Sequence, residues 1–104
     1  MTRKDLAAIL SKVAPTTYNE WAGKQGVPKP PFIAYLDDDP DIHAADNEAH
    51  IIEYRYRIEL YTPKGDDTTE DTLDDALKEA EIFFIKYARE WMADQKWYLT
   101  VYEI

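Results

Sequence analysis

An alternating stretch from His50 to Thr62 constrains the fold of this chain more than any other feature. Large apolar residues alternate with charged ones along it, in the order Ile52, Glu53, Tyr54, Arg55, Tyr56, Arg57, Ile58, Glu59, Leu60. Period two is typical of a β-strand with one buried face and one charged face. We therefore expect a long strand whose charged row pairs with neighbouring strands or with another subunit. That row consists of Glu53, Arg55, Arg57 and Glu59.

The N-terminal segment from Thr2 to Ala14 has the spacing of an amphipathic helix. Its apolar residues recur every three to four positions: Leu6, Ile9, Leu10 and Val13. Thr2 and Asp5 match a capping box closely, so the helix should start there. Pro15 ends it, because the residue before a proline resists the helical conformation.

A second, longer helix is predicted to begin between Asp67 and Thr69 and to end near Ala93. Acidic residues crowd its start, where the helix dipole favours anions, and Lys86 and Arg89 lie toward its end. Its apolar stripe comprises Leu73, Ala76, Leu77, Ala80, Phe84, Tyr87, Ala88 and Trp91. At 1.5 Å per residue it would be about 37 Å long and could cover the long strand from end to end.

Three shorter stretches complete the pattern. Tyr18 to Trp21 is interpreted as a weak strand, Phe32 to Leu36 as a buried strand and Trp97 to Ile104 as a C-terminal strand. A polar loop is expected from Asp37 to about Glu48. The resulting order predicts an α+β fold in a single domain spanning residues 1–104. We expect a small, mainly antiparallel or mixed sheet, with a short N-terminal helix and one long helix packed on one face.

The charge balance limits the classes of protein that fit. The chain has 104 residues, with 12 Lys and Arg against 21 Asp and Glu, and a formal charge of −9. This argues against a nucleic-acid binder, which needs clustered basic residues. No apolar run reaches the roughly 18–20 residues that span a bilayer, and the absence of cysteine excludes disulfides and thiolate chemistry. Synthesis in the cytoplasm is the simplest interpretation.

No catalytic constellation stands out. Ser11 is the only serine, so a Ser-His-Asp triad would need it together with His43 or His50. Phosphate-binding glycine motifs are missing, and a small sheet with one covering layer leaves little room for a substrate cleft. The aromatic residues fall mostly at core positions, which favours packing over a stacking platform for sugars or bases. We expect no enzymatic activity, no catalytic residue and no cofactor.

The acidic loop allows one alternative, a cation site. Asp37, Asp39, Asp41 and Glu48 have the spacing of an EF-hand calcium loop. However, Ile42 occupies the position where that loop needs glycine, and the flanking segments are predicted strands. A metal shared by His43, Asp46 and His50 would lack a clear further ligand. We therefore assign no metal site and interpret the stretch as a solvated acidic loop.

Several stretches together resemble a known group of proteins. They are Tyr18-Asn19-Glu20-Trp21, Pro30-Pro31-Phe32-Ile33-Ala34-Tyr35, Ala45-Asp46-Asn47, Ile58-Glu59-Leu60-Tyr61-Thr62 and Val101-Tyr102-Glu103-Ile104. In this order and spacing the chain resembles small head-tail joining proteins of tailed phages and prophages of Gram-positive bacteria, of the tail-completion or tail-terminator kind. The resemblance spans roughly residues 15 to 104. The run Asp37-Asp38-Asp39-Pro40-Asp41 is more acidic than that pattern.

The resemblance implies a structural virion protein that forms a homohexameric ring. The ring would cap the tail tube, contact the major tail protein and join the tube to the head connector. DNA would pass through its lumen without specific binding, which a negative charge would assist. The protein would be synthesised in the host cytoplasm and reside at the head-tail interface of the virion. Candidate interface or lumen residues are Trp21, Asp37, Asp38, Asp39, Asp41, Glu53, Arg55, Arg57 and Glu59.

Two other classes remain open from the sequence. The chain could be a different head-tail connector component, such as a stopper or adaptor. It could also be a small acidic binding or regulatory module, such as a nucleic-acid mimic. Mimics usually concentrate acids on one face, whereas here they divide between the start of the second helix and the predicted loop.

Overall fold

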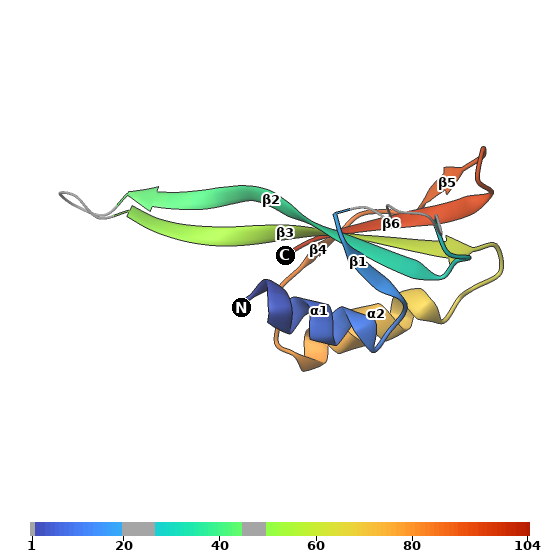
Figure 1. Ribbon diagram of the computed structural model, residues 1–104, viewed down its shortest axis with the longest axis horizontal. Helices are drawn as coiled ribbons and strands as arrows, with labels where there is room; N and C mark the ends of the chain where they lie inside the picture. Colours follow the sequence, from blue (N-terminus) through green and yellow to red (C-terminus); the bar gives the residue numbers. More distant parts are fainter. Residues whose placement is uncertain (1, 20–26, 45–49) are drawn as a thin grey trace.

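A computed structural model describes residues 2–19, 27–44 and 50–104, with the backbone alone for 39–44 and 50–54. Within these residues the chain forms a six-stranded mixed sheet with two helices packed on one face, an α+β fold as predicted (Figure 1). The strand order is β1-β2-β3-β6-β4, and β5 also pairs with β6. The elements are α1 (Arg3–Ser11), β1 (Thr16–Tyr18), β2 (Phe32–Ala44), β3 (His50–Pro63), α2 (Thr69–Glu79), β4 (Ile85–Lys86), β5 (Glu90–Met92) and β6 (Trp97–Glu103).

The two clearest sequence signals are confirmed. β3 occupies the alternating stretch, and its inward residues Ile58 and Leu60 are fully buried. α1 begins with the predicted capping box, because Asp5 N–H donates to the Thr2 hydroxyl and Thr2 N–H donates to the Asp5 carboxylate. The C-terminal strand is present as β6, which runs antiparallel to β3.

The predicted long second helix is wrong, because α2 ends at Glu79. The chain leaves the helix through Glu81 in the left-handed conformation, with φ of 59°. Ile82 N–H donates to the Leu77 carbonyl and Glu81 N–H to the Lys78 carbonyl, the two hydrogen bonds of a Schellman motif. Glycine usually occupies the left-handed position of this motif. Because Glu81 and not glycine occupies this position, the sequence gives no signal for the end of the helix. The aromatic and β-branched residues that follow form extended backbone and not a continuation of α2.

The predicted acidic loop is also largely strand. β2 continues through the acidic residues to Ala44, and its backbone pairs with β3. In this pairing Asp37 lies opposite Tyr56 and Asp38 lies opposite Arg55. An irregularity separates Asp38 from Asp41, after which the pairing resumes. The alternating β3 provides a backbone partner on both sides of this irregularity, so pairing overrides the low strand propensity of Asp.

The body of the protein packs its core between the sheet and the helices. Leu6 and Leu10 from α1 and Leu73 and Leu77 from α2 are fully buried against the inner face of β2, β3 and β6. Tyr102 of β6 is the largest fully buried side chain. The inner face also buries the hydroxyls of Thr62 and Thr100, which have no hydrogen-bond partner among the described residues.

The outer half of the β2–β3 hairpin projects from this body (Figure 1). β1 pairs with β2 only between Ile33 and Tyr35, and the C-terminal segment pairs with β3 only from Tyr56 onward, where Tyr56 and Ile104 exchange backbone hydrogen bonds. The remaining length of the two strands carries no helix beneath it, and the molecule extends over 52 × 31 × 24 Å as a result. Hence the long strand is covered by helices only at its base, and the expectation of end-to-end cover is wrong.

The first turn of α2 offers a stability test. Asp66 accepts hydrogen bonds from the backbone N–H groups of Thr68 and Thr69 and from both hydroxyls. Its slight burial works to raise the carboxyl pKa, but these hydrogen bonds outweigh burial and lower the pKa below the ordinary 3.8. The stabilisation is therefore present above pH 3.8 and is lost as the pH falls through the lower folded value.

We expect Asp66→Ala to lower the free energy of unfolding by about 1 kcal/mol at pH 7, the usual net cost of losing side-chain hydrogen bonds to the backbone. The difference from wild type should shrink at acid pH, because the protonated carboxyl accepts hydrogen bonds poorly. Urea denaturation at pH 7 and at pH 3 would measure both effects. Asp67→Ala is the matched control, since Asp67 accepts no hydrogen bond from the described residues. An equal loss in both variants would show that the Asp66 hydrogen bonds do not stabilise the start of α2.

Candidate functional site

The structure places the predicted acidic and mixed-charge residues on one hairpin. Asp37 and Asp38 lie on β2, directly opposite Tyr56 and Arg55 on β3. The backbones of Asp39 and Asp41 follow on β2, and Asp41 lies opposite Glu53. Two features that looked separate in the sequence, the acidic run and the alternating charged row, therefore belong to one structural unit.

The remaining two residues of the charged row lie nearer the body. Arg57 and Glu59 are opposite Leu36 and Ala34, on the sheet face that the helices do not cover. They form an ion pair with Nε and Oε2 3.2 Å apart, and Glu59 also accepts a hydrogen bond from the Tyr61 hydroxyl. Burial and the Glu59 carboxylate raise the pKa of Tyr61 to about 12. This ion pair joins two residues of β3 itself, so the prediction that the row pairs with neighbouring strands or with another subunit stays a prediction.

The base of the hairpin is tied to the N-terminal elements. The Tyr18 hydroxyl of β1 donates a hydrogen bond to the Asp37 carboxylate, which raises the tyrosine pKa. The Arg3 guanidinium of α1 stacks 4.2 Å from the centre of the Tyr18 ring. These contacts hold β1 beside β2 at the point where the hairpin leaves the body, so they fix its direction.

Other sequence expectations fall partly beyond the described part of the chain. Trp21, Asp46 and Glu48 lie outside the described residues. The stretch with EF-hand spacing is paired strand backbone from Asp41 to Ala44, not a loop that could wrap a cation. Among the side chains that the structure describes, no three potential metal ligands come together.

A second charged cluster escaped the sequence analysis. The ammonium of Lys86 on β4 lies 2.6 Å from a Glu70 carboxylate oxygen and 2.8 Å from one of Asp74, both on α2. The buried Tyr102 hydroxyl donates to the other Asp74 oxygen at 2.6 Å. Burial, together with Asp74, raises the pKa of Tyr102 far above its ordinary value. The cluster locks β4 and β6 to α2, and the burial of Tyr102 leaves its hydroxyl no access to a substrate.

Sequence reasoning also missed an exposed apolar row. It assigned residues 80–92 to a helix, whereas Phe83, Ile85 and Tyr87 extend along and beside the edge strand β4. Phe83 is 85% exposed, the most exposed large apolar side chain in the described chain. The run Ile82-Phe83-Phe84-Ile85 was the available signal, because four consecutive bulky residues favour a strand over a helix with one apolar stripe.

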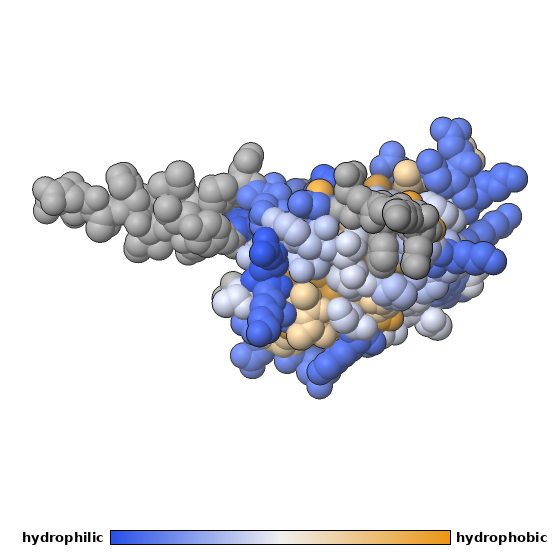
Figure 2. All heavy atoms as spheres, in the orientation of Figure 1, coloured by the Kyte–Doolittle hydropathy of each residue, from blue (hydrophilic) through white to orange (hydrophobic). Residues whose placement is uncertain are grey.

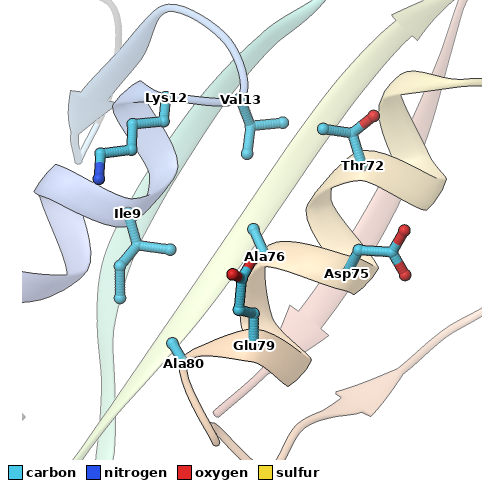
Figure 3. A pocket seen from close by; sticks show the side chains of 8 residues that line it. All are labelled: Ile9, Lys12, Val13, Thr72, Asp75, Ala76, Glu79 and Ala80. Carbon is cyan, nitrogen blue, oxygen red and sulfur yellow. The ribbon is translucent and has the colours of Figure 1, made fainter.

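A groove separates the two helices (Figure 3). It has a volume of about 490 Å³, with Ile9 and Val13 of α1 and Ala76 and Ala80 of α2 as its apolar lining. Lys12, Thr72, Asp75 and Glu79 complete its walls. Figure 2 shows apolar atoms gathered over the two helices and bordered by hydrophilic ones.

Comparisons with protein-family models and with curated proteins find no match to this chain. No helix within residues 2–19, 27–44 and 50–104 is long and apolar enough to cross a membrane. The fold and these surfaces define a small α+β domain with a projecting hairpin. Its described features are suited to contacts with other macromolecules: a charged extension, an apolar strand edge and an open groove.

Proposed function

We propose that this protein is a structural subunit of a phage virion, a tail-completion or tail-terminator protein. Copies of the chain, six by analogy with such rings, would cap the tail tube and join it to the head connector. The projecting hairpin is the observation that supports this proposal most. A stable isolated domain gains little from a long two-stranded extension, whereas a subunit of an assembly can use it to reach a neighbour.

The charge of the hairpin is consistent with either position that the proposal allows. Asp37, Asp38, Asp39 and Asp41 supply four acidic positions within five residues of β2. Facing a lumen, they would repel DNA phosphates and let DNA slide. Facing a neighbour, they would seek basic groups of another subunit or of the connector. In both cases the major tail protein and the connector are the proposed partners.

A small acidic binding or regulatory module is the second candidate. The groove between α1 and α2 favours it, because Asp75 and Glu79 border an apolar lining. Such a groove suits a basic amphipathic segment of another protein. A stopper or adaptor role within the same particle remains a variant of the first proposal and differs only in the neighbour contacted.

The test is the composition of phage particles from the strain that encodes the chain. We expect purified particles to contain the protein, with about six copies each if a single cyclic ring forms. A nonsense mutation in the gene should leave filled heads and separate tails, visible by electron microscopy. Supplying the protein in trans should restore joined particles. Its absence from purified particles, or one copy per particle, would refute the proposal.

A further inference from the structure

The segment after α2 presents apolar side chains on the outer side of the sheet edge. Ile82 and Phe84 pack against the core, whereas Phe83, Ile85 and Tyr87 are 85%, 43% and 47% exposed. This alternation follows from the period of extended backbone. Exposed apolar residues gathered at one edge are typical of protein–protein contacts.

The edge itself is open for a further strand. β4 is the last strand in the order β1-β2-β3-β6-β4, with no described strand on its far side. Natural edges are usually protected by proline or by outward charges. The one charged residue of β4, Lys86, instead binds Glu70 and Asp74 on the helix side. The outer side of β4 therefore carries neither proline nor an outward charge, although β4 is only two residues long and offers a short template for an added strand.

The same chain carries a matching element. From Asp41 to Ala44 and from His50 to Glu53, the two hairpin strands have only each other as neighbours among the described strands. A two-stranded ribbon is marginally stable in water, so adding it to a sheet would stabilise it. The hairpin projects clear of the helices and is accessible to a second molecule (Figure 1).

Topology forces the contact to be intermolecular. β6 lies between β3 and β4, so the hairpin cannot reach β4 of its own chain without displacing β6. Lys86 is paired with Glu70 and Asp74 on the helix side, so Arg89 beside β4 is the basic residue nearest the edge that could face the acidic positions of β2. The Arg89 side chain is 41% exposed and interacts with Glu70 at 3.6 Å.

We propose that the outer half of the β2–β3 hairpin docks along the free edge of β4 of a second copy, covering Phe83 and Ile85. Main-chain hydrogen bonds would supply affinity, and the apolar row would be removed from water. The contact joins two different surfaces, so successive copies form a closed ring when the rotation closes. This contact would join the subunits of the proposed ring, and its role in the particle rests on the proposed function.

Two variants each remove one half of the contact. In the first, the dipeptide Asn-Gly replaces residues 39–54. The backbone of Tyr56 faces Ile104, with which it exchanges hydrogen bonds, so the backbone of the next residue, Arg55, faces β2. Asp38 and Arg55 lie opposite each other and can therefore flank a two-residue turn. We call this the hairpin-shortened variant. The second is the double substitution Phe83→Glu and Ile85→Glu. Val27→Glu is the control, because Val27 is 50% exposed and lies in a recess with Phe32 and Trp97, at the end of β6 opposite the one that pairs with β4.

Analytical ultracentrifugation from about 10 µM to about 1 mM tests the contact over the range of weak to moderate affinities. We expect wild type and Val27→Glu to self-associate, and each interface variant to do so at least about tenfold more weakly. An equimolar mixture of the two variants should form a one-to-one dimer and nothing larger, because each brings one intact half. Circular dichroism would verify that all four proteins are folded.

Three outcomes would overturn the inference. The first is a wild type that stays monomeric over the whole concentration range, and the second is self-association that neither variant weakens. The third is self-association that both variants lose while their equimolar mixture forms no dimer. The particle experiment is independent of these measurements. A chain that associates as expected but is absent from purified virions would refute the proposed function and leave the subunit contact standing.

Discussion

Phage that encode the hairpin-shortened protein should produce separate heads and tails and lose infectivity by several orders of magnitude. The variant removes residues 39–54, which include the acidic positions Asp39 and Asp41 and, of the charged row, Glu53 alone. If the hairpin makes the subunit contact, its removal prevents ring closure, and an incomplete ring cannot join a tail to a head. Plaque titre and electron microscopy of lysates measure the two effects.

Folding should survive the same change. The backbone of the outer hairpin pairs with no other described strand and projects away from the helices (Figure 1), so we expect the free energy of unfolding to change by less than about 1 kcal/mol. The control is the charge variant Asp37→Asn, Asp38→Asn, Asp39→Asn, which keeps the whole hairpin backbone. It removes the charges and keeps the backbone for strand addition. Asp39→Asn alone is tested beside it, because Asp37 also accepts the Tyr18 hydrogen bond at the base of the hairpin. Normal titre in the hairpin-shortened phage would rule out a function for the hairpin.

The parts of the fold that the sequence predicted are those where local pattern and tertiary environment agree. β3 alternates because one face meets the core, and α1 begins at a capping box that needs no distant partner. The hairpin was partly missed because the strand character of the acidic run depends on pairing with β3 and not on Asp itself. Pairing partners distant in the sequence are invisible to local propensity.

The candidate site was predicted in its residues but not in its geometry. Asp37, Asp38, Arg55 and Arg57 were singled out by charge alone, and only the register shows that they share one hairpin. The β4 edge was missed because Glu81 takes the left-handed position normally given to glycine. Without that signal, the apolar residues from Ala80 to Trp91 fit a helical stripe well enough to extend α2 by more than three turns.

Tyr102→Ala should cost the most stability of any single substitution in the described core, about 3–5 kcal/mol of unfolding free energy. Tyr102 is fully buried on β6, and its ring meets that of Phe84 edge-on with centroids 5.6 Å apart. Its hydroxyl donates to Asp74 on α2, so the side chain links sheet, helix and the start of the β4 segment. Its removal leaves a cavity and also weakens the placement of the apolar edge that β4 presents.

Tyr102→Phe separates the ring from the hydroxyl. Lys86 still contacts Asp74 in this variant, so the carboxylate keeps a partner and the loss should be only about 1 kcal/mol. Urea denaturation of both variants gives the two free energies, and the midpoints should fall in the order wild type, Tyr102→Phe, Tyr102→Ala. If Tyr102→Phe were as unstable as Tyr102→Ala, the hydrogen bond to Asp74 and not the buried ring would hold α2 and β4 against β6.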